Sequence, residues 1–259
     1  MVGRGRGKGE KAVMIGAQGR IWRQVLIFVG VLVLTILRQA FGYEVITVTG
    51  GGTIEGQVTL QGVVPTPEKI EITKDEETCG KTEKINERLV VGADGGVQNV
   101  VVSIENIGRG KRQQREGALL DQKDCRYAPH VVLVPVGASL TMKNSDGILH
   151  NLHSHSVANP AFNKPQPKFK KTLKEMFTKP EIIKLTCDAH AWMSGWIIVH
   201  EHPYYAVTDE HGRFSLSDVP SGEYQLRVWH ETMGEKRLPL TVKQEVRENL
   251  RIEMELPNP

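Results

Sequence analysis

Short segments in which apolar and polar residues alternate make up most of the chain beyond residue 43. Residues 53–60 and 250–256 alternate almost strictly, which is the period of a β-strand with one buried face. Gly, Pro, Asn and Asp interrupt these segments every few residues, as expected of turns between short strands. The sequence beyond residue 43 contains no long amphipathic helix and no internal repeat. The pattern therefore predicts an all-β fold in which antiparallel sheets pack as a sandwich.

Individual elements can be assigned from the same pattern. Residues 130–143 look like a hairpin that turns at Gly137, and residues 172–177 allow a short helix within an irregular crossover. Apolar residues at 182–186 and 196–200 predict one strand on each side of Cys187. Further strands are expected at 53–60, 70–72, 97–104, 238–242 and 250–256. Residues 206–216 are expected to form a strand, an Asp-x-x-Gly turn and a strand, and residues 218–229 repeat this arrangement around a Pro-Ser-Gly turn.

The strand pattern divides the chain beyond the leader into two regions, residues 44–203 and residues 204–259. The second region would be a small C-terminal β-sandwich module, but its roughly 55 residues are few for an independent core. Either it packs directly on the first region, or it includes an N-terminal strand such as 53–60. The sequence does not decide between these arrangements.

Residues 1–43 have the composition of a targeting segment. A basic stretch precedes an uninterrupted apolar run at 25–37, and Ala40-Phe-Gly42 follows as a cleavage candidate. We interpret this region as a secretory signal peptide, with an uncleaved N-terminal anchor as the alternative. The apolar run of 13 residues is short for a spanning helix, which needs about 20. The protein is expected to be periplasmic or extracellular, and attached to a membrane only if the anchor is retained.

The leader also accounts for the basic character of the chain. The formal net charge is +3, but residues 1–43 hold seven Lys or Arg and one Glu, so the remainder carries −3. The only local basic run, at 109–115, reads as a solvated loop or as a docking patch for an acidic partner. No surface for nucleic acid is predicted.

The most distinctive chemistry lies in two segments. The first ends at His150-Asn151, and the second, 36 residues later, reads Cys187-Asp-Ala-His190-Ala-Trp-Met193. Together they supply two imidazoles, one thiolate and one thioether. Soft sulfur ligands favour Cu(I), and two His, one Cys and a weak axial Met form the ligand set of blue-copper electron-transfer sites.

These segments resemble the cupredoxin family, whose pattern runs Asn-x-Asp-x-x-x-His-Asn and then Cys-x2-His-x2-Met-x-Gly-x-Ile/Val-x-Val. The matching residues are Asn144, Asp146, His150, Asn151, Cys187, His190, Met193, Gly195, Ile197 and Val199. The short spacing between His190 and Met193 is similar to that of amicyanins.

The resemblance implies a Greek-key cupredoxin β-sandwich over residues 44–203 that holds one type 1 copper. It implies that His150, Cys187 and His190 are the strong ligands and Met193 the axial one. Asn151 would join the two ligand segments through hydrogen bonds. His190 would lie at the solvent-facing end of its loop and serve as the electron port.

A second resemblance concerns the C-terminal region. Thr208-Asp209-x-x-Gly-x-Phe214, followed by Pro220-x-Gly-x-Tyr224, resembles the carboxypeptidase regulatory-like β-sandwich. That resemblance implies a passive or binding module. Trp229 and His230 in this region are interpreted as packing and turn residues.

Zinc binding and nucleophilic catalysis are two other possible uses of the same residues. Zinc also takes Cys and His, but it has no use for a thioether such as that of Met193. A nucleophilic pair of Cys187 with a His would need an oxyanion hole, and no such motif accompanies it. With Cys187 assigned to the metal, Cys79 and Cys125 are left to form a disulfide in an oxidising compartment. The alternative is that Cys79 and Cys125 are separate buried thiols.

Further histidines lie near the predicted site. His153 and His155 share one face of a strand, whereas His150 points to the other, so the three are not expected to bind one ion. His153 and His155 form either a second exposed metal site or a polar strand end. His130 is expected to be a buried, hydrogen-bonded residue. Trp192 either forms part of the patch through which an electron leaves or shields the site.

These observations lead to one functional expectation and its rival. We expect an exported mononuclear type 1 copper protein that transfers single electrons between redox partner proteins and is not an enzyme. The rival is a copper storage or delivery protein, or a structural module without redox turnover. A copper enzyme subunit that needs a second centre is a third reading.

Overall fold

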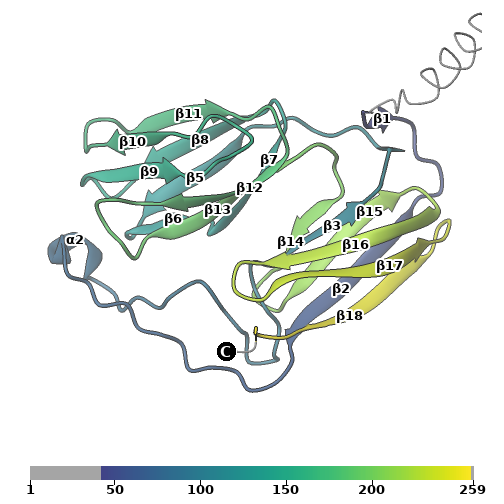
Figure 1. Cartoon of the computed structure of the whole chain (residues 1–259), viewed down its shortest axis with the longest axis horizontal. Helices are drawn as coiled ribbons and strands as arrows, with labels where there is room; N and C mark the ends of the chain where they lie inside the picture. Colours follow the sequence, from purple (N-terminus) through teal and green to yellow (C-terminus); the bar gives the residue numbers. More distant parts are fainter. Residues whose placement is uncertain (1–41, 258–259) are drawn as a thin grey trace, which may run out of the picture. The chain divides into compact units, whose positions relative to one another are not determined.

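Residues 42–257 are described by the computed structural model, and they form an almost entirely β structure (Figure 1). The expected all-β sandwich architecture is therefore confirmed. The leader expected at 1–43 lies, apart from its last two residues, outside the described range. Along that range, no helix has the length and apolar character needed to cross a membrane.

Nine strands form the larger of two sandwiches. One sheet has the order β10-β9-β12-β13-β7, and the other has the order β11-β8-β5-β6. Their bounds are β5 Ala118–Lys123, β6 Arg126–Ala128, β7 Val131–Pro135, β8 Ser139–Asn144, β9 His150–Ser154, β10 Asn163–Gln166, β11 Thr172–Met176, β12 Glu181–Thr186 and β13 Ser194–His200.

Seven strands form the smaller sandwich, in sheets ordered β14-β3-β16-β17 and β15-β2-β18. Their bounds are β2 Gly52–Leu60, β3 Val101–Glu105, β14 Tyr205–Val207, β15 Arg213–Val219, β16 Gly222–His230, β17 Gly234–Val242 and β18 Arg247–Met254. A short parallel pair, β1 (Glu44–Val45) with β4 (Arg109–Gly110), completes the strands.

The boundary expected at residues 203/204 does not separate the two sandwiches. Strands β2 and β3 precede the larger sandwich in the sequence, yet they pair with C-terminal strands of the smaller one. Residues Ile54 and Val58 of β2 are fully buried in its core. The strands after residue 204 supply too little apolar surface to close a core alone, so the chain returns to its N-terminal strands to complete it.

Four local expectations are corrected by the pairing. Strands β7 and β8 do not form a hairpin, because the turn at Gly137 carries the chain from one sheet to the other. Residues 172–176 form strand β11 along β8 instead of a helix. Residues 70–72 form no strand of their own. Within the two sandwiches, three strand pairs are parallel, β13 with β7, β5 with β8 and β18 with β2, so the sheets are mixed.

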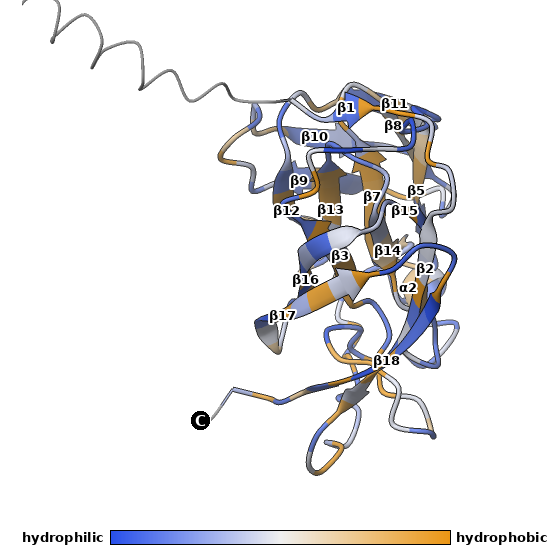
Figure 2. Cartoon of the chain, turned by 90° about the vertical axis from the view of Figure 1, so that its right-hand side faces the viewer, coloured by the Kyte–Doolittle hydropathy of each residue, from blue (hydrophilic) through white to orange (hydrophobic). Residues whose placement is uncertain are grey.

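Strand β13 is buried on both faces, which explains its continuous apolar sequence. Ile197 and Val199 face the core of the larger sandwich, together with Leu152 and Ile183. On the opposite face, Ile198 packs in a separate cluster with residues of the smaller sandwich. Figure 2 shows the apolar character of β7 and β13. Trp196 of β13 and Trp229 of β16 belong to this cluster, with ring centroids 5.0 Å apart.

The connection from β2 to β3 crosses from the smaller sandwich to the larger one (Figure 1). We call residues 61–96 the strap. It carries the short helix α2 (Glu76–Cys79), and the disulfide Cys79–Cys125 ties it to the β5–β6 turn. The expected pairing of these cysteines is confirmed, and Cys187 is the free, buried one. Buried Lys84 of the strap adds an ion pair of 3.4 Å with Asp124.

Candidate metal centre

Strands β9, β12 and β13 position the predicted ligands. His150 begins β9, Cys187 follows β12 directly, and the loop 187–193 leads into β13. Within this loop, the backbone N–H of Met193 donates to the carbonyl of His190 (3.0 Å), and that of Cys187 donates to the carbonyl of Met193 (3.2 Å). The loop is therefore closed on itself by its own backbone.

A side chain at Gly195, the second residue of β13, would crowd its neighbours. A Cβ added at Gly195 would lie 3.0 Å from the carbonyl oxygen of His130 and 3.2 Å from Cβ of Tyr127. Gly195 therefore allows β13 to pack closely enough to hold the loop against the sheet.

Three predicted ligands converge in the interior. Nδ1 of His150 lies 3.0 Å from Nδ1 of His190, and Sγ of Cys187 lies 3.8 Å from the same atom of His190. The residues His150 and His190 are fully buried, and Cys187 is 3% exposed. Metal–ligand bonds of about 2.0 Å to nitrogen and about 2.3 Å to sulfur are long enough for one ion to reach all three donors. The donor set therefore fits a single transition-metal ion.

Met193 and Asn151 both form hydrogen bonds with Cys187 through their backbones. Met193 is 1% exposed and packs in the same apolar cluster as Cys187. The backbone N–H of Asn151 donates to Sγ of Cys187 (3.4 Å), and its side-chain oxygen accepts from the backbone N–H of Asp188. These two hydrogen bonds connect β9 with the loop that follows β12.

Each histidine of the cluster forms a hydrogen bond with a carboxylate through Nε2. Nε2 of His150 lies 2.8 Å from Asp146, and Nε2 of His190 lies 2.8 Å from Asp75. A nitrogen that donates to a carboxylate carries a proton, so the lone pair of each ring is directed through Nδ1 into the space shared with Cys187. Two imidazole lone pairs that converge beside a buried sulfur are the chemistry of a metal site.

The charges within the cluster agree with this arrangement. Burial raises the pKa of Cys187, but hydrogen bonds with His150 and His190 and from the backbone of Asn151 outweigh it and lower this pKa to about 6. Burial lowers the pKa of His150, but its contacts with Asp146 and Cys187 outweigh this and raise it to about 9. At neutral pH the metal-free protein thus holds a Cys187 thiolate beside a His150 imidazolium. The thiolate is the form that binds metals, and a metal ion would displace the proton from Nδ1 of His150 and so free its lone pair.

The environment of His190 differs from the expectation. His190 is not at a solvent-facing edge, because its side chain is fully buried beneath the strap. Trp192 is half-buried beside it, with ring centroids 5.0 Å apart, and donates its indole N–H to the carbonyl of Cys125 (3.2 Å). The side chain of Trp192 therefore shields His190.

Asp75 is a residue of the cluster that sequence reasoning missed. It lies 115 residues before His190, in a segment without strand periodicity. The expected disulfide is the signal that could have pointed to Asp75. Cys79 is four residues from Asp75, and its partner Cys125 donates its backbone N–H to Asp146, the residue that contacts His150.

His153 and His155 are exposed or half-exposed, and their rings stack with centroids 4.5 Å apart. His153 lies 2.9 Å from Asp188, and His155 lies 2.8 Å from the Thr186 hydroxyl. Within residues 42–257, the clusters of three or more candidate donors are His150/Cys187/His190 and Cys125/Asp146/His150, and the second includes a disulfide cysteine. A separate metal site at His153 and His155 stays a prediction.

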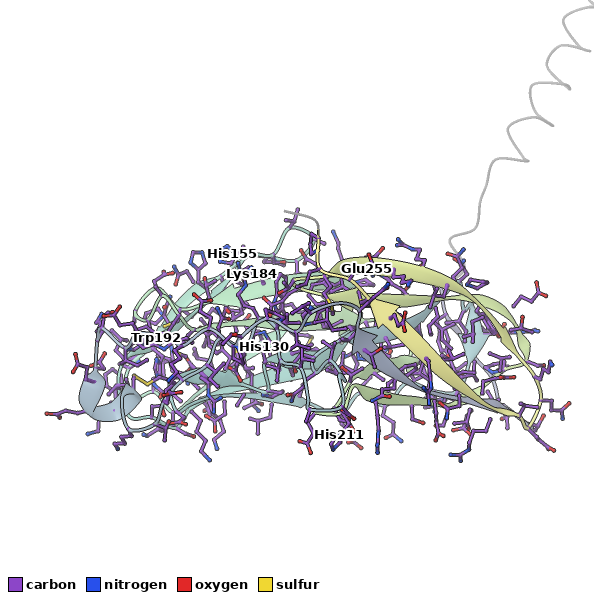
Figure 3. All side chains as sticks on the ribbon, turned by 90° about the horizontal axis from the view of Figure 1, so that it is seen from below. His130, His155, Lys184, Trp192, His211 and Glu255 are labelled. Carbon is purple, nitrogen blue, oxygen red and sulfur yellow. A yellow bond between two sulfur atoms is a disulfide. The ribbon has the colours of Figure 1, made fainter. Side chains whose placement is uncertain are left out.

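His130 is buried and hydrogen-bonded, as expected. It precedes β7 in the larger sandwich, and its Nε2 bonds with the carboxylate of Glu231, which follows β16 in the smaller one. Figure 3 shows His130 at a distance from Trp192, which lies toward α2. His130 therefore belongs to the contact between the sandwiches and not to the candidate metal centre.

Among known proteins, the chain resembles solved structures. No family model matches the chain, and no curated protein matches it. The copper-containing nitrite reductase NirK from Thermus scotoductus SA-01 matches at 23% identity and a TM-score of 0.32, over 36% of this chain and 24% of that one. The chain thus spans about a quarter of that reductase.

Two smaller solved proteins match over nearly their whole length. A purple cupredoxin from Nitrosopumilus maritimus matches at 24% identity and a TM-score of 0.28, over 32% of this chain and 99% of that one. A reduced Cu(I) form of an amicyanin mutant matches at 22% identity and a TM-score of 0.30, over 32% of this chain and 82% of that one.

Proposed function

We propose that this protein binds one copper ion as a type 1 centre and transfers single electrons between redox partner proteins. The observation that carries the proposal is the buried convergence of Nδ1 of His150, Nδ1 of His190 and Sγ of Cys187. Met193 would complete the set as a weak axial ligand. Bound copper would supply the one-electron couple between Cu(II) and Cu(I).

The role of the chain is to hold the donors in place. His150 and Cys187 stand at the ends of paired strands, and Asn151 joins them through hydrogen bonds. Because the donors are already gathered and water is excluded by burial, little rearrangement is needed when the oxidation state changes. The carboxylates of Asp146 and Asp75 keep the imidazoles turned toward the thiolate.

Such a site suits a carrier better than an enzyme. Its three donors are buried beneath the strap and the side chain of Trp192, so a substrate has little access to them.

We further propose that the protein works outside the cytoplasm, where the Cys79–Cys125 disulfide persists. The leader segment would direct it there.

Voltammetry of the copper-loaded full-length protein tests the proposal. We expect a reversible one-electron wave that is absent from the Cys187→Ala variant. Met193→Leu should keep the wave and shift it to higher potential, because an axial donor to Cu(II) is removed. A reversible wave that persists in Cys187→Ala would overturn the assignment of the ligands.

The burial of His190 favours one alternative, a copper storage protein. With no exposed imidazole edge, electrons would enter and leave slowly, while the bound metal would be well retained. A copper-loaded protein that gives no wave with any electrode or small mediator, yet retains its metal against chelators, would support storage.

A further inference from the structure

One hydrogen bond links the candidate metal centre to a distant part of the chain. The carboxylate of Asp75, in the strap, lies 2.8 Å from Nε2 of His190. The side chain of His190 is fully buried, whereas that of Asp75 is 38% exposed. The carboxylate therefore takes the place that water would hold at the edge of this imidazole.

The backbone of the strap is arranged to present this carboxylate. Asp75 has φ 50° and ψ 41°, a left-handed conformation that Asp adopts more readily than most residues. Its carbonyl accepts hydrogen bonds from the backbone N–H groups of Thr78 (2.9 Å) and Cys79 (2.8 Å). Cys79 is joined in turn to Cys125. The carboxylate is thus attached covalently, through four residues and a disulfide, to the sandwich that it contacts.

We propose that Asp75 is a positioning residue for the metal ligand His190. The inference rests on the proposed function, since His190 must bind the metal. By accepting the Nε2 proton, Asp75 fixes the tautomer whose Nδ1 lone pair is free for the metal, and it makes that nitrogen a stronger donor. A stronger donor stabilises Cu(II) more than Cu(I). The strap is then a working part of the metal centre as well as a connection between sandwiches.

Two substitutions separate charge from side-chain contact. Asp75→Asn keeps the shape and tolerates the left-handed backbone but removes the charge, and Asp75→Gly removes the side chain at a φ that glycine adopts freely. Glu77→Gln is the matched control, because it removes the same charge from the short helix that directly follows Asp75, and within residues 42–257 no hydrogen bond joins the Glu77 side chain to the cluster. All are made in the full-length chain.

The first readout is copper binding and potential. Asp75→Gly should weaken Cu(II) affinity by about 10- to 100-fold, the usual effect of removing a carboxylate partner of a ligating His. If Cu(II) affinity falls tenfold more than Cu(I) affinity, the potential rises by about 59 mV. Asp75→Asn should change both quantities in the same direction but less. Glu77→Gln should change the affinity less than twofold.

The second readout needs no copper. In the metal-free protein, nitrogen-15 NMR of the histidine rings should show a slowly exchanging Nε2–H signal for His190, which is lost in Asp75→Gly and retained in Glu77→Gln. Loss of this signal in Asp75→Gly supports the positioning role even if the wild-type protein forms no type 1 centre. The proposal is overturned if Asp75→Asn and Asp75→Gly behave like Glu77→Gln in both readouts.

Discussion

The disulfide that holds the strap should contribute strongly to stability, and its effect can be worked out from the chain. Cys79 and Cys125 are separated by 46 residues, and both are fully buried. In the chain-entropy model, closing a loop of this length restricts the unfolded state by about 4 kcal/mol at 25 °C. For a protein of this size, that free energy corresponds to a fall in Tm of roughly 8–16 °C.

The test is thermal unfolding of the metal-free protein followed by circular dichroism. Cys79→Ala, Cys125→Ala and the double variant are compared in a Cys187→Ser background, so that the free thiol cannot exchange with the disulfide. Each variant loses the same cross-link. The two single variants and the double variant should therefore lose nearly equal stability, with the double loss far below the sum of the single losses.

Two results would contradict this role of the disulfide. A loss of less than about 1 kcal/mol in the double variant would mean that the cross-link scarcely restricts the unfolded chain. Single losses that add up in the double variant would mean that each cysteine acts through its own packing. In the second case the strap would be held by Lys84 and its other contacts, and not by the disulfide.

Two further predictions concern other regions. Glu231→Gln should lower the free energy of unfolding by about 3 kcal/mol in urea titrations, because it breaks a buried pair with His130. The exposed control Glu253→Gln should change this free energy by less than about 0.5 kcal/mol. A loss in Glu231→Gln no larger than that of the control would contradict a role for this pair. Burial opposes ionisation of Glu181, but hydrogen bonds from Ser156 and from the backbone of Val157 and Ala158 prevail and lower its pKa from 4.5 to about 2. A lowered pKa stabilises the folded state above the unfolded pKa, so Tm should fall as the pH drops from 4.5 toward 2, and Glu181→Gln should lack this part of the fall. An identical pH profile of Tm in the variant would count against these hydrogen bonds.

The strands were predictable where one face is buried and the other is not. Strand β2 alternates in sequence and in burial along its whole length, so its period of two identifies it. The pairing of strands was less accessible. Gly137 marks a turn in the sequence, but the chain passes there from one sheet to the other, and the sequence does not distinguish such a turn from a hairpin. Likewise, nothing local indicates that β2 pairs with β18, almost 200 residues later.

The candidate site was predictable to the extent that its donors are close in sequence or have unusual chemistry. The loop from Cys187 to Met193 carries its donors at short spacing, and the structure gathers it with His150. The local sequence does not reveal Asp75, because a carboxylate in an irregular segment looks like any exposed acid until the fold brings it to His190, and only the expected disulfide at Cys79 hinted at its position. The burial of His190 could not be read from local sequence either, because it depends on the strap, and no local pattern connects the strap to His190.

The proposed function depends on a type 1 copper centre formed by His150, Cys187, His190 and Met193. The most direct measurement is the visible absorption and electron paramagnetic resonance spectrum of the full-length protein loaded with Cu(II). We expect an intense thiolate-to-copper charge-transfer band together with a narrow copper hyperfine splitting. A colourless protein with an ordinary tetragonal Cu(II) signal, or one that retains only zinc, would contradict it.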